Sequence, residues 1–233
     1  MDSRVEQAID DLREGRIVLI YDAEGREEET DLIVASQFVT PEIVRILRKD
    51  GGGLIFLMVH ADIWKKFKLP YLTDVYLENW DRYPVFKALV PNDIPYDTKS
   101  SFSLTINHRK TFTGITDVDR ALTMKEFANL AEKSFDVQDG YALDMFGQEF
   151  RSPGHVPICS ASKDILKDRF GHTELSVALI SMAGLVPVAT GCEMMGDDGY
   201  ALAKEKAMAY AEQHDSIFLE GKDIVEAWRV WSE

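Results

Sequence analysis

An acidic run near the start of the chain is the segment best suited to chemistry. Residues 24–31 read EGREEETD, which places five carboxylates around one arginine. Carboxylates this close repel one another unless positive charge lies among them, and a divalent cation supplies it. Glu27, Glu29 and Asp31 fall at alternate positions, so an extended backbone would present them on one side, as suits Mg²⁺. Arg26 would then face the other side. The alternative is a solvated acidic loop.

A second polar cluster, residues 169–174 with the letters RFGHTE, opens an expected helix. Backbone N–H groups at a helix start bind phosphate oxygens, and Gly171 would permit close approach. Arg169 can add a charged pair of donors and Thr173 a hydroxyl. His172 could ligate a metal, but a lone histidine there is also compatible with a surface residue or a cap. The cluster therefore predicts a phosphate site beside a metal, with that alternative open.

Two further side chains are suited to proton transfer. His155 follows the turn-like letters RSPG at residues 151–154, and histidine exchanges protons near neutral pH. Glu193 follows an apolar run, where partial burial can raise the pKa of a carboxylate toward that of a general base. Either residue could instead be an ordinary structural group. Cys192 is interpreted as a small core residue rather than a nucleophile.

A threonine-rich turn, residues 111–116, precedes Asp119 and Arg120. Its hydroxyls, including that of Thr113, could close over an anionic ligand. An ordinary threonine-rich turn explains the same pattern.

Buried elements must hold these residues in place. Apolar runs at residues 17–21 and 32–35 flank the acidic run, so its charges would lie between two core strands. A capping box at Thr123 and Glu126 predicts the start of a helix. Scattered prolines predict irregular structure over residues 70–100. Strands and helices alternate without regular βαβ order, which predicts an α+β fold, a mixed β-sheet packed with helices.

Length and charge restrict the class of protein. The 233 residues show no linker or repeat, so we expect a single domain over residues 1–233. A net charge of −14 argues against nucleic-acid and membrane partners. No apolar run reaches the roughly 18 residues of a membrane span, and the start lacks the features of a signal peptide. Cys159 and Cys192 have no CxxC spacing, which suits a reducing compartment. We expect a cytoplasmic protein.

Taken together, the motifs resemble those of the 3,4-dihydroxy-2-butanone 4-phosphate synthase family of riboflavin biosynthesis. Five motifs in chain order carry the resemblance: DAEGREEETD at 22–31, TGITDVDR at 113–120, PGHV at 153–156, GHTE at 171–174 and CEMMGDDG at 192–199. The letters PNDIPYD at 91–97 are similar to the archaeal branch. Five ordered motifs are far more specific than any one of them.

The resemblance implies a lyase that converts D-ribulose 5-phosphate to L-3,4-dihydroxy-2-butanone 4-phosphate and formate. A divalent metal, Mg²⁺ or Mn²⁺, would stabilise an enediolate. The resemblance also implies a homodimer with shared active sites. Glu27 and His172 would hold the metal, and His155 and Glu193 would be the acid/base pair. The substrate-binding residues would be Arg26, Glu27, Asp31, Thr113, Arg169, Phe170, Gly171, His172, Thr173 and Glu193.

Two other functions are compatible with the same residues. A metal-dependent sugar-phosphate isomerase or aldolase needs the same stabilisation of negative charge, but an isomerase releases no formate. A non-catalytic acidic module would bind a cation or a partner protein and turn over no sugar phosphate.

Overall fold

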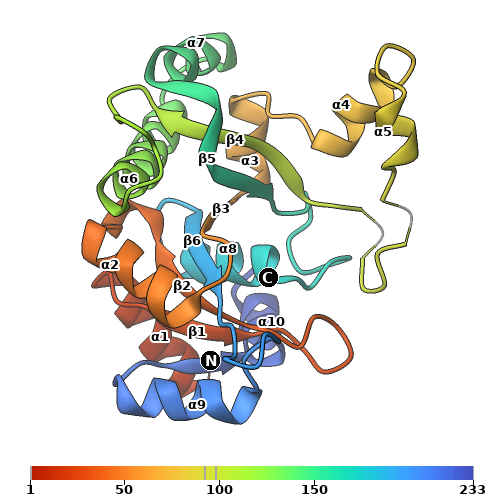
Figure 1. Ribbon diagram of the computed structural model, residues 1–233. Coiled ribbons are helices and arrows are strands. Elements are labelled where there is room, and N and C mark those ends of the chain that lie inside the picture. Colours follow the sequence, from red (N-terminus) through yellow and green to blue (C-terminus); the bar gives the residue numbers. More distant parts are fainter. Residues whose placement is uncertain (1, 92, 98, 233) are drawn as a thin grey trace.

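One mixed β-sheet organises the chain, and the structure, a computed structural model, describes residues 2–91, 93–97 and 99–232. Met1, Asn92, Thr98 and Glu233, which belong to the predicted domain, lie outside the described residues. In the described part the sheet has seven strands in the order β4-β5-β3-β6-β2-β1-β7 (Figure 1). The strands are β1 (Val18–Tyr21), β2 (Thr30–Ala35), β3 (Phe56–Val59), β4 (Phe102–His108), β5 (Phe150–Ser160), β6 (Val188–Glu193) and β7 (Phe218–Glu220).

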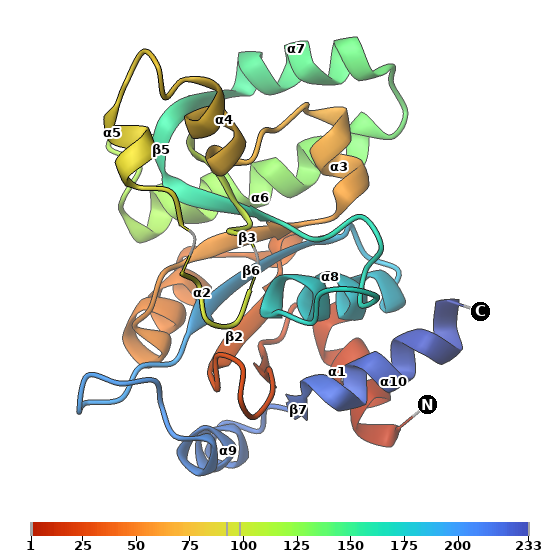
Figure 2. The same ribbon diagram turned by 90° about the vertical axis from the view of Figure 1, so that its right-hand side faces the viewer.

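Helices cover both faces of this sheet (Figures 1 and 2). One face carries α1 (Ser3–Arg13), α8 (His172–Met182) and α10 (Gly221–Ser232). The other carries α2 (Pro41–Ile46), α3 (Ala61–Lys66), α6 (Asp117–Ser134), α7 (Asp139–Glu149) and α9 (Lys204–Gln213). The short helices α4 (Leu72–Glu78) and α5 (Val85–Ala88) project beside β4, and two brief turns, η1 (Ser36–Phe38) and η2 (Leu47–Gly51), flank α2.

Alternating side chains build an apolar layer on each face of the sheet. Leu19 and Leu32 belong to the layer that contains α6, while Ile20 and Ile33 belong to the layer that contains α8. All four side chains are fully buried. This two-sided burial explains why both runs flanking the acidic segment are almost entirely apolar.

The sheet brings the ends of distant segments together. The strands β1 and β2 are antiparallel and joined by residues 22–29, which carry most of the acidic run. The β2–β6 ladder places Asp31 opposite Glu193. The helix α8 begins at His172 against the same part of the sheet. Charged residues that are far apart in the chain therefore meet where β2 pairs with β6.

The predicted α+β fold with a mixed sheet is confirmed, but three local predictions were wrong. The helix expected to start at Thr123 begins at Asp117, with Thr116 as its N-cap, and Thr123 is buried inside it. Residues 70–100 contain α4 and α5 as well as irregular backbone. The turn expected over residues 151–154 belongs to β5, so His155 lies inside this strand rather than at its edge. Tertiary pairing overrode the local turn signals in this strand.

In the described part of the chain, no helix combines the length and the hydropathy needed to span a bilayer.

Candidate functional site

A charged pocket of about 150 Å³ lies where these segments meet. The acidic loop, the start of β2, the end of β6 and the start of α8 all contribute to it. The lining residues are Glu27, Glu29, Asp31, Phe56, Tyr96, Ser101, Phe102, Cys159, Arg169, His172, Thr173 and Glu193. Six of the predicted site residues are in this set, and they come from three separate stretches of sequence.

Glu27 and His172 are in direct contact inside this pocket. The Nδ1 atom of His172 lies 3.0 Å from Oε2 of Glu27, and its Nε2 atom lies 3.2 Å from the carbonyl oxygen of Glu29. The imidazole is buried, with 6% of its surface exposed. The structure thus brings together the two residues that the family resemblance assigns to a metal.

Asp22 fixes the conformation of the acidic loop by accepting hydrogen bonds from it. Its carboxylate accepts hydrogen bonds from the backbone N–H groups of Glu27 (3.0 Å) and Glu29 (3.2 Å). It also accepts one from Arg26 Nη1 at 3.1 Å, and Arg26 pairs with Glu27 at 2.8 Å. The loop is consequently a tight turn rather than an extended strand. The prediction that Arg26 faces away from Glu27 was therefore wrong.

Asp31 and Glu193 face each other across the β2–β6 ladder. Among the described residues, neither carboxylate oxygen of Asp31 has a hydrogen-bond partner, although Oδ1 lies 3.7 Å from His172 Nε2. Glu193 accepts a 2.7 Å hydrogen bond from the backbone N–H of Leu54. Burial raises the pKa of both carboxyl groups. A base with a raised pKa in a pocket is suited to accept protons near neutral pH.

The donor set fits a divalent cation. Single ligand atoms of Asp22, Glu27 and His172 all lie within 4.8 Å of one another. Burial would lower the pKa of His172, but Asp31, Glu27 and Asp22 together raise it to about 9. The carboxylates thus hold a proton on the imidazole, and a cation bound among these groups can take the place of that proton. Two protein ligands with several waters are typical of Mg²⁺.

Arg169 and Gly171 form a second, positively charged corner beside the start of α8. Arg169 Nη1 pairs with the buried Glu174, and Glu174 also accepts a 2.8 Å hydrogen bond from the backbone N–H of Ser162. Gly171 is the N-cap of α8. A Cβ at this glycine would lie 2.7 Å from Arg26 Nη2, so a larger residue here would displace the Arg26 guanidinium. This corner has the donors that an anion needs.

His155 and Thr113 lie elsewhere, in a separate group on the exposed side of β4 and β5. The backbone N–H of His155 donates to Asn107 Oδ1 at 2.9 Å, and Asn107 Nδ2 lies 3.1 Å from His155 Nδ1. Thr113 donates through its backbone N–H to Asp119 at 3.1 Å. Gly114, next to Thr113, packs against Asn107, which in turn contacts His155. The threonine turn and His155 therefore form one group. The structure does not bring His155 or Thr113 into the charged pocket of the same chain.

Phe170 is 40% exposed and does not line the pocket.

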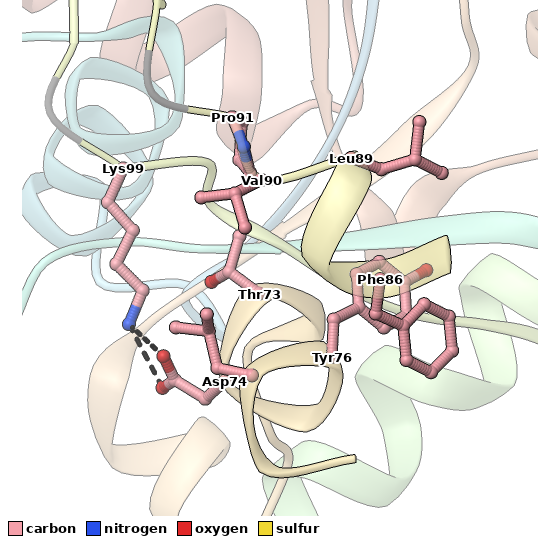
Figure 3. A pocket seen from close by; sticks show the side chains of 9 residues that line it. Thr73, Asp74, Tyr76, Phe86, Leu89, Val90, Pro91 and Lys99 are labelled. Atoms are coloured by element: carbon pink, nitrogen blue, oxygen red, sulfur yellow. Dashed lines mark hydrogen bonds and ion pairs between the residues drawn. The ribbon is translucent and has the colours of Figure 1, made fainter. Parts of the chain in front are cut away.

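A larger hollow of about 260 Å³ lies between α4 and the segment after α5 (Figure 3). Its lining is mainly apolar, and its one carboxylate, Asp74, is paired with Lys99 at 2.9 Å. Because this lining is mainly apolar and Asp74 is already paired with Lys99, the smaller charged pocket is the better candidate for an active site.

Comparison with known proteins assigns this architecture to one family. The family model of 3,4-dihydroxy-2-butanone 4-phosphate synthase matches residues 6–227. The chain belongs to this family. The 3,4-dihydroxy-2-butanone 4-phosphate synthase of Methanothermobacter thermautotrophicus is 49% identical over 96% of this chain and 95% of its own length. That of Archaeoglobus fulgidus is 45% identical over 98% and 95%.

Solved structures of 3,4-dihydroxy-2-butanone 4-phosphate synthases share the fold. A cation-free form superposes with a TM-score of 0.77 at 23% identity, covering 98% of both chains. A synthase in complex with two magnesium ions gives a TM-score of 0.74 at 24% identity, covering 94% of both chains. The prediction that this chain is a synthase of this family, an enzyme of riboflavin biosynthesis, is confirmed. The isomerase, aldolase and non-catalytic alternatives are set aside.

Sequence reasoning missed several residues that line the pocket or contact its side chains or His155. Tyr96 and Asp97 lie in the proline-rich segment, where no periodicity points to a role. Asn107 was not distinguished from its strand neighbours, yet it orients His155. The contact of Gly53 with Glu193 depends on the pairing of two distant segments. Glu174 lies within the GHTE motif, and Tyr96 and Asp97 lie within the letters PNDIPYD, so family resemblance is the signal that could have found them.

Proposed function

We propose that the charged pocket binds D-ribulose 5-phosphate and a divalent cation, and that this chain releases formate from the sugar. Glu27 and His172 would hold Mg²⁺, with Mn²⁺ as the alternative because imidazole is an uncommon ligand of Mg²⁺. The contact between these two side chains carries the proposal. When bound, the cation would act as a Lewis acid toward the negative charge that develops on the sugar oxygens.

The side chains of the pocket have complementary roles in this proposal. Asp31, whose buried oxygens have no hydrogen-bond partner in the described part of the chain, would accept hydrogen bonds from sugar hydroxyls, and Arg26 would donate hydrogen bonds to sugar oxygens. Glu193 would take a proton from the carbon next to the ketose carbonyl, because its raised pKa makes it a base near neutral pH. The backbone N–H of Leu54 holds this carboxylate in one position.

The positively charged corner would hold the phosphate group of the substrate. Arg169, with the backbone N–H groups of residues 171–173, offers donors on one side, and Thr173 adds a hydroxyl. A phosphate held away from the reacting carbons orients the sugar for repeated proton transfer. Phe170 would contribute only backbone to this corner, because its exposed side chain does not line the pocket.

We further propose a homodimer in which His155 and Thr113 complete the site of the partner subunit. Cys159 lines the pocket, and His155 lies four residues earlier in the same strand, a distance of about 13 Å along β5. His155 is exposed in the monomer, so a partner can reach it. A two-fold axis would place each His155 group against the other subunit's pocket.

Intersubunit complementation tests the shared site. His155→Ala and Glu193→Gln variants should each be nearly inactive. If they are unfolded together and refolded as a mixture, half of the dimers are hybrids, and each hybrid has one intact site. Activity should therefore return to about a quarter of the wild-type value. A mixture as inactive as its components would reject the shared site.

The reaction itself is tested by incubation with D-ribulose 5-phosphate followed by a formate assay. Formate release that chelator abolishes, and that Mg²⁺ restores, is the expected result. Turnover without formate would reject the assigned reaction. Both cysteines are buried and free, which suits a reducing compartment, so we place the enzyme in the cytoplasm and treat residues 1–233 as one synthase domain.

A further inference from the structure

A carboxylate from a distant segment occupies the positively charged corner. The Oδ2 atom of Asp97 lies 2.5 Å from Arg169 Nε and 3.8 Å from Arg26 Nη2. Asp97 belongs to the segment that precedes β4, far in sequence from both arginines. The corner assigned above to the substrate phosphate is thus already neutralised by the chain itself.

Asp97 and Glu174 differ in burial and in the backbone that carries them. Glu174 lies in the first turn of α8, its side chain is fully buried, and Ser162 donates to it from the backbone. Asp97 lies in irregular backbone. Its side chain retains 13% exposure. An incoming anion can therefore replace Asp97 at Arg169 without disturbing the helix, whereas replacing Glu174 would leave a buried charge unpaired.

The two arginines converge on the point that Asp97 occupies. A Cβ at Gly171 would lie 2.7 Å from Arg26 Nη2 and 3.2 Å from Arg169 Cζ, so both guanidinium groups lie against the start of α8. Arg26 Nη2 is buried and has no hydrogen-bond partner in the described part of the chain. The unused donor and the displaceable carboxylate indicate that the corner can bind a larger anion with more acceptor atoms.

We propose that Asp97 is an internal counter-anion that competes with the substrate phosphate for Arg169 and Arg26. This inference rests on the proposed function of the pocket. A phosphate dianion placed beside Asp97 would be repelled, so the carboxylate leaves as the phosphate enters. The competition weakens the binding of every anion, and only a ligand with additional contacts to the sugar site overcomes it. Because both ligands lose the same factor in affinity, Asp97 leaves free phosphate a weak ligand, whereas a sugar phosphate with its additional contacts still binds.

The segment that carries Asp97 is tethered on its far side. Lys99 pairs with Asp74 at 2.9 Å (Figure 3), and its Nζ atom lies 4.0 Å from the centre of the Tyr71 ring. On the near side, the Tyr96 ring lies 5.5 Å from Arg26 Cζ. The tether holds Asp97 close to the arginines after displacement, which gives the carboxylate a high effective concentration as a competitor.

Calorimetric titration of the wild-type enzyme with inorganic phosphate tests this proposal. If Asp97 occupies the corner about nine-tenths of the time, Asp97→Asn should bind phosphate roughly tenfold more tightly. Asp168→Asn is the matched control, because Asp168 is exposed next to Arg169 in sequence and its loss changes the net charge equally. The control should change phosphate affinity by less than about twofold. Asp97→Ala should reproduce the tightening if Asp97→Asn folds poorly.

Phosphate affinity that is unchanged or weaker in both Asp97 variants would overturn the proposal, since Asp97 would then be structural or a direct ligand. A parallel formate assay separates this result from failure of the proposed function. An active wild-type enzyme without tightening in the variants rejects the counter-anion alone. A wild-type enzyme that releases no formate rejects the assigned reaction, whatever the phosphate titration gives.

Discussion

The imidazole of His172 and the carboxylate of Glu27 lie 3.0 Å apart although 145 residues separate them in the chain. One begins α8 and the other lies in the turn between β1 and β2. The sheet that joins these segments is therefore what creates the geometry of the proposed metal site. Everything proposed for the pocket depends on this contact, and the first prediction addresses it directly.

Removing either partner should weaken metal binding. Even the loss of an outer-shell partner commonly costs about 10–100-fold in metal affinity, so Glu27→Gln and His172→Ala should lose at least this much. Calorimetry with Mg²⁺, or electron paramagnetic resonance with Mn²⁺, measures the loss. Glu24→Gln is the control, because Glu24 lies in the same loop with its side chain 73% exposed. Equal losses in all three variants would indicate a general charge effect rather than two ligands.

Gly53→Ala should displace the Glu193 carboxylate. A methyl group at Gly53 would lie 2.9 Å from both Cβ and the backbone oxygen of Glu193, closer than packed atoms allow. Loss of a positioned proton-transfer group typically costs about 10²–10⁴ in rate, and misplacement should reach the lower part of that range. Measurement of kcat tests this expectation, with Gly147→Ala, where nothing crowds the new methyl group, as control. Unchanged turnover in Gly53→Ala would contradict it.

Arg169→Lys and Glu193→Gln should affect different kinetic constants. Lysine keeps the charge but loses the fork of donors, so KM should rise about tenfold with little change in kcat. Glu193→Gln removes a base, so kcat should fall about 10²–10⁴-fold. Steady-state kinetics with D-ribulose 5-phosphate distinguishes the two effects. If Arg169→Lys mainly lowered kcat and Glu193→Gln mainly raised KM, the assigned roles would be wrong.

Arg169→Ala should also destabilise the fold, because it leaves the buried Glu174 without its guanidinium. Burial raises the pKa of Glu174, and Arg169 acts against this effect. Breaking a buried pair from one side typically costs about 3–5 kcal/mol. In urea unfolding, the double variant Arg169→Ala/Glu174→Gln should be more stable than Arg169→Ala alone. A double variant that is less stable would show that the pair is not energetically coupled.

Asp119 should give the protein a pH-dependent contribution to stability. The backbone N–H of Gly114 donates to it at 2.8 Å, and this bond, with those from Phe112 and Thr113, lowers the pKa of Asp119. A lowered folded pKa stabilises the protein above the unfolded value of about 3.9. The stabilisation is lost as the pH falls through the folded pKa.

Asp119→Asn should therefore cost about 1 kcal/mol at pH 7 and progressively less as the pH falls below about 3.9, because the charge that strengthens these bonds is lost on protonation. Urea unfolding between pH 2 and pH 7 measures the difference. The exposed Asp136, changed to Asn, serves as control. A constant difference across this range would mean that hydrogen-bond geometry rather than charge holds the turn.

Local sequence was sufficient for the parts of the site that depend on neighbouring residues. The acidic turn, the polar start of α8 and the carboxylate that ends β6 were all recognisable, because a turn, a helix start and a strand end each depend on a few adjacent residues. Ordered motifs were enough to identify the family. The metal pair, Glu27 and His172, was inferred from that resemblance rather than from geometry.

Only the tertiary structure decided which of these residues meet. Strand pairing placed Asp31 against Glu193, and it left His155 about 13 Å along β5 from Cys159 in the pocket. It also brought Asp97 to Arg169, from a segment without any periodic signal. Such contacts depend on sheet register and on packing between distant elements. These long-range energies involve many residues at once, and so no short stretch of sequence records them.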